Sequence, residues 1–283
     1  MNKMKMVILF LLIFFSCLYS QEDKFKLEYK FQNGERLQYK IERHDSITTS
    51  AAGQEMKFNT TIFMLQSLVV EEAGKDKSFT LKLKTDSVWT DKNTENMINT
   101  SSSMNRMGER RSQRRTFSRA MGRFGNQQRE RKITITTNGR QSQDSGQPIP
   151  FLITLPEKEV SVNDTWDFEI KFDNKGRSKG TTTIKGECLL YDIEKKDSKN
   201  IAVIVANSET NSESQFKFQI QERTISGSNV SKSTQYSIVY FDIDKGRIVE
   251  IVSEETSEST RESGGMTTPS TRKSNISIKL LSG

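Results

Sequence analysis

The sequence predicts a mainly β protein, built as two similar antiparallel β-meander units that each resemble a half-barrel, with one short helix in an insertion. Two observations carry this prediction. Apolar residues recur at every second position in run after run, which is the period of a strand that buries one face. Turn signals such as Asn33-Gly34, Asn138-Gly139 and Asp244-Lys245-Gly246 separate the runs, so we expect neighbouring strands to pair as hairpins.

The alternating runs account for most of the chain between residues 25 and 280. Each run is expected to bury one face and to expose the other, as strands of antiparallel sheets do. Trp166, Phe168 and Ile170, for example, are expected to face the core together. The apolar positions are Phe25, Leu27, Tyr29 and Phe31; Leu37, Tyr39 and Ile41; Phe79, Leu81 and Leu83; Ile133 and Ile135; Trp166, Phe168, Ile170 and Phe172; Ile201, Val203 and Val205; Phe216, Phe218 and Ile220; Tyr236, Ile238 and Tyr240; and Ile276, Ile278 and Leu280.

An internal repeat indicates the two units. The stretch FQNGERLQYKIERHD aligns with VSVNDTWDFEIKFD, so that Asn33 falls on Asn163 and a turn precedes a strand in both. We therefore expect a first β unit over residues 21–143, with an Arg-rich insertion at 100–130, and a second β unit over 163–283. The linker at 144–162 carries three of the four prolines, and its apolar middle predicts that it packs against the units.

Residues 1–20 are predicted to be a signal peptide, because Lys3 and Lys5 precede an uninterrupted apolar run from Met6 to Tyr19. A helix of this run reaches about 21 Å, short of the roughly 30 Å hydrocarbon core. Two processing routes remain open: cleavage near Ser20-Gln21, or lipidation of Cys17 as in a bacterial lipoprotein. The protein is thus expected to be periplasmic or secreted, or anchored to a membrane through Cys17.

After cleavage, Cys188 is the single remaining thiol, so an intramolecular disulfide is impossible. Cys188 stands beside Leu189 and Leu190 in an apolar run, and we expect it to be buried and inert. A chain of this length without a disulfide must rely on a packed core.

The positive charge of the chain is concentrated in one segment. Asn105–Lys132 holds ten Lys or Arg against two Glu, a net charge of +8 that exceeds the +7 of the whole chain. Within it, Phe117, Ala120, Met121 and Phe124 have helical spacing and predict a short helix over 112–124. One interpretation is a helix whose apolar side packs on the sheet; the other is a basic face that docks anionic partners, using Arg114, Arg115, Arg119 and Arg123. Nucleic acid is not an expected partner of an exported protein.

The sequence lacks the residue motifs that several kinds of catalytic and metal sites require. His44 is the single histidine, it is expected to be exposed, and neither a nucleophile elbow nor a phosphate-binding glycine loop occurs. Asp242–Gly246 is better explained by a hairpin turn than by a calcium loop. The cluster Glu254, Glu255 and Glu258 is interpreted as a solvated strand edge or loop. The sequence therefore predicts no catalytic residue, no metal ligand and no cofactor.

Four motifs together resemble a domain-of-unknown-function family of exported β-rich proteins from Gram-negative bacteria. They are the Asn-Gly turn before the first long strand, the ITITTNGR run, LPEKEVSVNDTW (Leu155 to Trp166) and FDIDKGRIVEI, and the match covers most of residues 25–281. Asn163 replaces the Gly expected before the Asp, and the Arg-rich segment is enlarged. The resemblance implies export and a β fold, and it brings no catalytic residues.

From these observations we predict an exported, non-catalytic binding protein that holds an apolar or lipid-like ligand between curved sheets. The alternative is a cell-envelope interaction protein that docks anionic partners through the Arg-rich helix 112–124. A hydrolase is the third reading.

Overall fold

The computed structural model describes residues 23–51, 54–74, 76–93, 130–142, 147–174, 178–220 and 223–282. This part of the chain forms ten strands and no helix. The strands are β1 (Arg36–Ala51), β2 (Gln54–Ala73), β3 (Ser78–Asn93), β4 (Glu130–Thr136), β5 (Thr165–Asn174), β6 (Ser178–Lys196), β7 (Lys199–Ile220), β8 (Arg223–Asp242), β9 (Arg247–Ser263) and β10 (Met266–Ser282). The prediction of a mainly β, antiparallel protein is confirmed.

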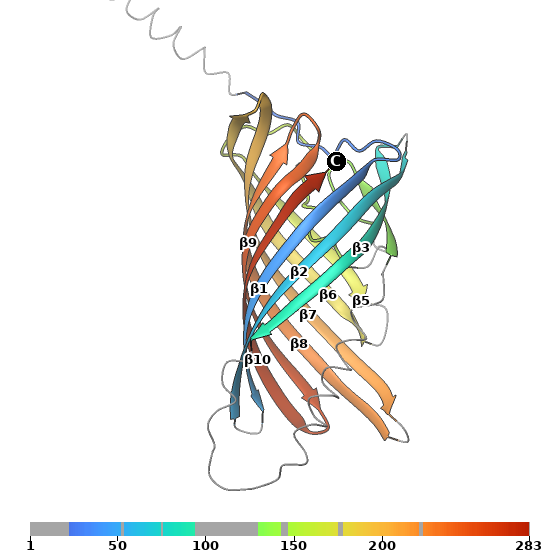
Figure 1. Ribbon diagram of the computed structural model, residues 1–283, viewed down its shortest axis with the longest axis vertical. Coiled ribbons are helices and arrows are strands. Elements are labelled where there is room, and N and C mark those ends of the chain that lie inside the picture. The colour runs from blue at the N-terminus through green and yellow to red at the C-terminus, as the bar shows by residue number, and fades with distance from the viewer. Residues whose placement is uncertain are drawn as a thin grey trace, which may run out of the picture.

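All ten strands belong to one antiparallel sheet, in the order β4-β3-β2-β1-β10-β9-β8-β7-β6-β5. The sheet curls into a half-barrel, with β1–β3 in front and β6–β8 behind in Figure 1. The sequence predicted two similar units and left open whether they form one domain or two; the structure does not support a division into two units, because all ten strands belong to one sheet. β1–β4 and β5–β10 are each a meander, but β1 and β10 pair with each other from Gln38↔Ser282 to Thr49↔Ser270.

The physical reason for this single sheet lies in the strand edges. Two separate meanders would leave β1 and β10 as long edges with unpaired N–H and C=O groups, which cost free energy and invite aggregation. Pairing β1 with β10 removes both edges at once. It also brings Ile41 beside Ile278, and both side chains are buried.

The core fills one end of the half-barrel. Leu27, Tyr29 and Phe31 are buried in it, but the predicted strand over Phe25–Phe31 is wrong: this segment is extended and makes an isolated bridge, Phe25↔Val160. The alternating pattern therefore reflects side chains that are buried in the core, not a backbone that pairs as a strand. The Tyr29 ring stacks on the Phe31 ring at a centroid distance of 5.4 Å, so the segment closes the core as packing, not as an added strand.

The predicted packing of residues 144–162 is confirmed where the segment is described. Ile149, Phe151 and Leu155 are buried in the same core as Leu27 and Tyr29. The Phe151 ring stacks on the Tyr39 ring with centroids 4.1 Å apart. The backbone is held as well, because Ile153 N donates to Tyr29 Oη at 3.0 Å and Tyr29 Oη donates to Ile153 O at 3.1 Å.

The predicted turns also lie where their residues indicated. Gly34, Gly139 and Gly246 have φ values of +77°, +79° and +60°, which favour glycine. At Gly246 a side chain would also collide, since an added Cβ would lie 2.5 Å from Lys30 N. Trp166 is half-buried beside the core, as its alternation predicted, and its Nε1 donates to Thr154 O at 2.9 Å. The predicted helix over 112–124 lies outside the described residues.

Replacing Phe151 by Ala should lower the free energy of unfolding by about 3–5 kcal/mol, as for other buried aromatic residues. The reason is that Phe151 is fully buried and stacked on Tyr39. Urea denaturation followed by circular dichroism measures the change. Met266→Ala, which removes a 71% exposed side chain, is the control and should change stability by less than about 1 kcal/mol. An unaltered midpoint in the Phe151 variant would show that residues 147–160 are not part of the core.

Candidate functional site

The inner face of the sheet changes from apolar to polar along the strands. One row across β7, β8, β9, β10 and β1 is apolar and buried: Ile204, Val239, Ile251, Ile278 and Ile41. Two rows further from the core, the same strands place Ser208, Gln235, Glu255, Ser274 and Asp45 on this face. The inner face therefore has an apolar half, which the core fills, and a polar half.

A network of four charged side chains and one hydroxyl occupies the polar half. Arg43 Nε lies 2.7 Å from Asp45 Oδ1, and Arg43 Nη2 lies 3.0 Å from Glu255 Oε2. Arg272 Nη2 lies 3.2 Å from Glu255 Oε1, and Ser274 Oγ donates to Asp45 Oδ1 at 2.6 Å. The Asp45 side chain is 6% exposed. Because two guanidinium groups balance two carboxylates, every buried charge has a partner of opposite sign.

Hydroxyl side chains line much of the remaining polar half. On this face β7 carries Ser208, Thr210, Ser212 and Ser214; β8 carries Ser231 and Ser233; β9 carries Ser257 and Ser259; and β10 carries Ser270. These nine residues are half-buried. Some pair with neighbours, as Thr182 Oγ1 and Ser212 Oγ do at 2.9 Å. A hydroxyl donates one hydrogen bond and accepts two, so this lining offers both donors and acceptors to a ligand.

Two glycines let aromatic rings lie against the inner face. A Cβ at Gly186 would be 2.6 Å from Phe168 Cζ, and a Cβ at Gly227 would be 2.5 Å from Phe216 Cζ. The guanidinium carbon of Arg261 also lies 4.6 Å from the centroid of the Phe216 ring, in cation–π contact. Each ring thus occupies the space that a side chain at the facing glycine would fill.

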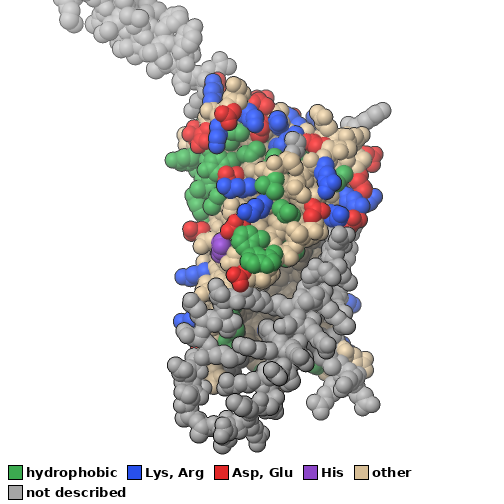
Figure 2. Space-filling view, in the orientation of Figure 1, with side chains coloured by type: hydrophobic (Ala, Val, Ile, Leu, Met, Phe, Trp, Pro, Cys, Tyr) green, Lys and Arg blue, Asp and Glu red, His purple; other side chains and the backbone are tan. Residues whose placement is uncertain are grey.

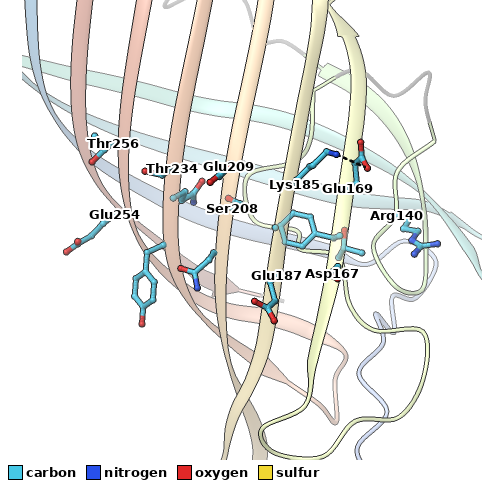
Figure 3. A pocket seen from close by; sticks show the side chains of 16 residues that line it. Arg140, Asp167, Glu169, Lys185, Glu187, Ser208, Glu209, Thr234, Glu254 and Thr256 are labelled. Carbon is cyan, nitrogen blue, oxygen red and sulfur yellow. Dashed lines mark ion pairs between the residues drawn. The ribbon is translucent and has the colours of Figure 1, made fainter.

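A groove of about 970 Å³ crosses β5–β9, and most of the side chains along it point away from the core. Five carboxylates line it, from Asp167, Glu169, Glu187, Glu209 and Glu254, together with Lys185 and Arg140 (Figure 3). Glu169 is paired with Lys185 at 3.6 Å. Within the described part of the chain, the other four carboxylates make no ion pair. The groove is therefore acidic.

The site residues predicted from the sequence lie mostly outside the described residues. This is true of Arg114, Arg115, Arg119 and Arg123 in the Arg-rich segment and of Cys17 near the start of the chain.

The predictions for His44 and Cys188 are confirmed. His44 is exposed, with Nδ1 3.0 Å from Thr61 Oγ1 and Nε2 3.0 Å from Glu42 Oε1. It lies beside a cluster of hydrophobic side chains in Figure 2. Cys188 is fully buried, and burial raises the pKa of its thiol to about 12. A thiol with this pKa holds little thiolate at neutral pH and is a poor nucleophile.

The interpretation of Glu254, Glu255 and Glu258 as a strand edge or loop is wrong. All three lie within β9, which is paired with β8 on one side and with β10 on the other. Alternation sends Glu254 and Glu258 outward and Glu255 inward, where it meets Arg43 and Arg272. Arg43 could have signalled this network, because it continues the alternation of Leu37, Tyr39 and Ile41 at an inward position.

The turn over Asp242–Gly246 is a hairpin between β8 and β9, as predicted, and Lys245 N donates to Asp242 Oδ1 at 2.9 Å. Among the described residues, no group of three or more His, Cys, Asp or Glu side chains is placed to hold a metal ion. No described helix is long and apolar enough to cross a membrane.

No protein-family model and no curated protein matches the chain. Among solved structures, the chain is similar to Pseudomonas aeruginosa OccK2 (OpdF) in complex with glucuronate, at 7% identity and a TM-score of 0.27, over 89% of this chain and 100% of that chain. It is also similar to Acinetobacter baumannii OccAB2, at 8% identity and a TM-score of 0.24, over 88% and 98% of the two chains. A third structure, the CymD monoaromatic hydrocarbon channel, has 9% identity and a TM-score of 0.22, over 89% and 90%. Likeness at these TM-scores carries no argument about this chain.

Replacing Asp45 by Ala should destabilise the protein by about 3 kcal/mol, because it leaves Arg43 and Ser274 without their buried acceptor. Chemical denaturation measures the loss. Glu258→Ala, on the exposed side of β9, is the matched control and should stay within about 0.5 kcal/mol of the parent. Equal stability of the two variants would contradict a structural role for the network.

Proposed function

We propose that the protein is an exported binding protein, without catalytic function, whose polar inner face holds a hydrophilic ligand. The observation that carries the proposal is the change from an apolar to a polar lining along the inner face of the curled sheet. The apolar half is occupied by the side chains of the chain itself, such as Tyr29 and Phe151. The side chains of the polar half are half-buried, and this is the part of the inner face that we assign to the ligand.

The lining favours a hydrophilic ligand over the apolar or lipid-like ligand that the sequence predicted. An apolar ligand would cover the hydroxyls of β7–β10 and leave them without hydrogen-bond partners, which costs about 1–3 kcal/mol for each group. A polyhydroxylated ligand such as a glycan replaces those partners, because its own hydroxyls also donate and accept. Arg272 adds a charged side chain to this lining, and that side chain is 36% exposed.

Export is part of the same proposal, and it rests on residues 1–20 and on the resemblance to exported proteins of Gram-negative bacteria. Whether processing ends at Gln21 or at a lipidated Cys17, the folded sheet would work outside the cytoplasm. Glycans and other polyhydroxylated molecules are abundant ligands in that setting. The alternative, docking of anionic partners through Arg114, Arg115, Arg119 and Arg123, concerns a segment outside the described residues.

Filling the polar inner face should abolish ligand binding without unfolding the protein. Ser231 and Ser259 are paired neighbours there, and Ser231→Leu/Ser259→Leu replaces two hydroxyls with bulk. We expect the parent protein, purified from its native source without detergent, to carry a hydrophilic molecule that native mass spectrometry detects. The double variant should lose it, because the ligand's hydrogen-bond partners are gone.

The matched control is Val230→Leu/Thr260→Leu, which changes the pair next to it on the outer face of the same strands. This control should retain the ligand, and both variants should keep the melting temperature of the parent within a few degrees. Recovery of a lipid from the parent, or equal ligand retention in both double variants, would overturn the proposal.

A further inference from the structure

The outer face of β6–β9 carries an apolar patch that no described residue covers. Leu189, Val205, Ile238 and Val252 form one row across these four strands. Tyr191 is 60% exposed, Tyr236 is 45% exposed and Val252 is 44% exposed. These residues lie outside the core cluster of the inner face. Contiguous exposed apolar patches on a protein surface mark interaction sites.

The acidic groove adjoins this patch on the side away from the core. The next row along the same strands holds Glu187, Asn207, Tyr236 and Glu254, with Asp167 on β5. Tyr236 thus belongs to both the apolar patch and the groove. Asp167, Glu187, Glu209 and Glu254 make no ion pair within the described part of the chain. A segment that fits this surface must present apolar side chains flanked by cations.

We infer that residues 105–129 of the same chain dock on this surface. The eight Arg of this segment, against one Glu, complement the unpaired carboxylates of the groove. Its apolar residues Phe117 and Met121 complement the row that includes Val205 and Ile238. Arginine suits such a site, because its guanidinium group pairs with carboxylates in a bidentate manner and packs on tyrosine rings. No other stretch of the sequence combines this charge with apolar side chains.

Chain connectivity supports docking within one molecule. The segment leads into β4 at Glu130, and the turn after β4 carries Arg140, which itself lines the groove beside Asp167 and Glu169. The seven residues of β4 span about 23 Å. A stretch of about seven extended residues before Glu130 covers the same distance in return. Residues 94–129 supply 36 residues between β3 and β4, which is ample.

The docked segment lies on the opposite face of the sheet from the polar inner face, so this inference does not rest on the proposed ligand. When the segment is docked, its arginines pair with the carboxylates of the groove. They are then not available to an anionic partner.

Trypsin cleavage of the full chain tests the inference, because a docked segment protects its Lys and Arg from the protease. Peptides released by cleavage within residues 105–129 are quantified by mass spectrometry at low salt. In the variant Glu187→Gln/Glu209→Gln/Glu254→Gln, cleavage should be about tenfold faster than in the parent. Adding about 1 M salt should accelerate cleavage of the parent in the same way.

The matched control is Glu194→Gln/Glu213→Gln/Glu262→Gln, which changes exposed carboxylates on the same three strands outside the acidic groove. It should be cleaved at the parent rate. The apolar contact is tested by Tyr236→Ser, which should accelerate cleavage, whereas Val230→Ser on the same strand should not. Unfolding of a variant is detected by circular dichroism, and the salt arm needs no variant at all.

Three outcomes would overturn the inference. One is rapid cleavage of the parent segment at low salt, at the rate of the groove variant. Another is protection that survives both the groove substitutions and high salt. The third is protection that falls on dilution, because that result would place the segment on a second copy of the chain.

Discussion

The pairing of β1 with β10 is the constraint on which the rest of the structure depends. It joins strands from the two ends of the chain and turns two meanders into one sheet. Several polar contacts secure it or lie close to it. Ser274 on β10 donates to Asp45 on β1, and Tyr39 Oη donates to Ile248 O at 3.1 Å. Because a one-residue slip would send Asp45 to the outer face and break this contact, the network also specifies the register.

The curl that follows from this pairing separates two surfaces with different chemistry. Inside, alternation brings hydroxyl and charged side chains together beyond the core, where Arg43 and Glu255 balance each other. Outside, alternation on the same strands produces an acidic groove beside an apolar row. The two proposals therefore use opposite faces of the same strands and can be separated by substitutions one residue apart.

Local patterns predicted local structure well. Two-residue alternation located strands, although the alternating run Phe25–Phe31 is not one. Glycines such as Gly34 and Gly246 located turns, and an apolar neighbourhood placed Cys188 in the core. Long-range pairing was beyond these patterns, because alternation says which face of a strand is buried but not which strand lies beside it. The internal repeat was read as two units for that reason. The ionic network was missed on the same ground: Asp45 and Ser274 are 229 residues apart.

Native-state hydrogen exchange of the backbone amides in β1 and β10 tests the central claim, that one sheet closed by this pair forms a single cooperative unit. We expect the amides that link Ile41 with Ile278 to exchange only through global unfolding, with the same free energy and denaturant dependence as the central amides of β7 and β8. Exchange of the β1–β4 amides through a separate, lower-energy opening, while β5–β10 remain protected, would contradict the claim and restore the two-unit description.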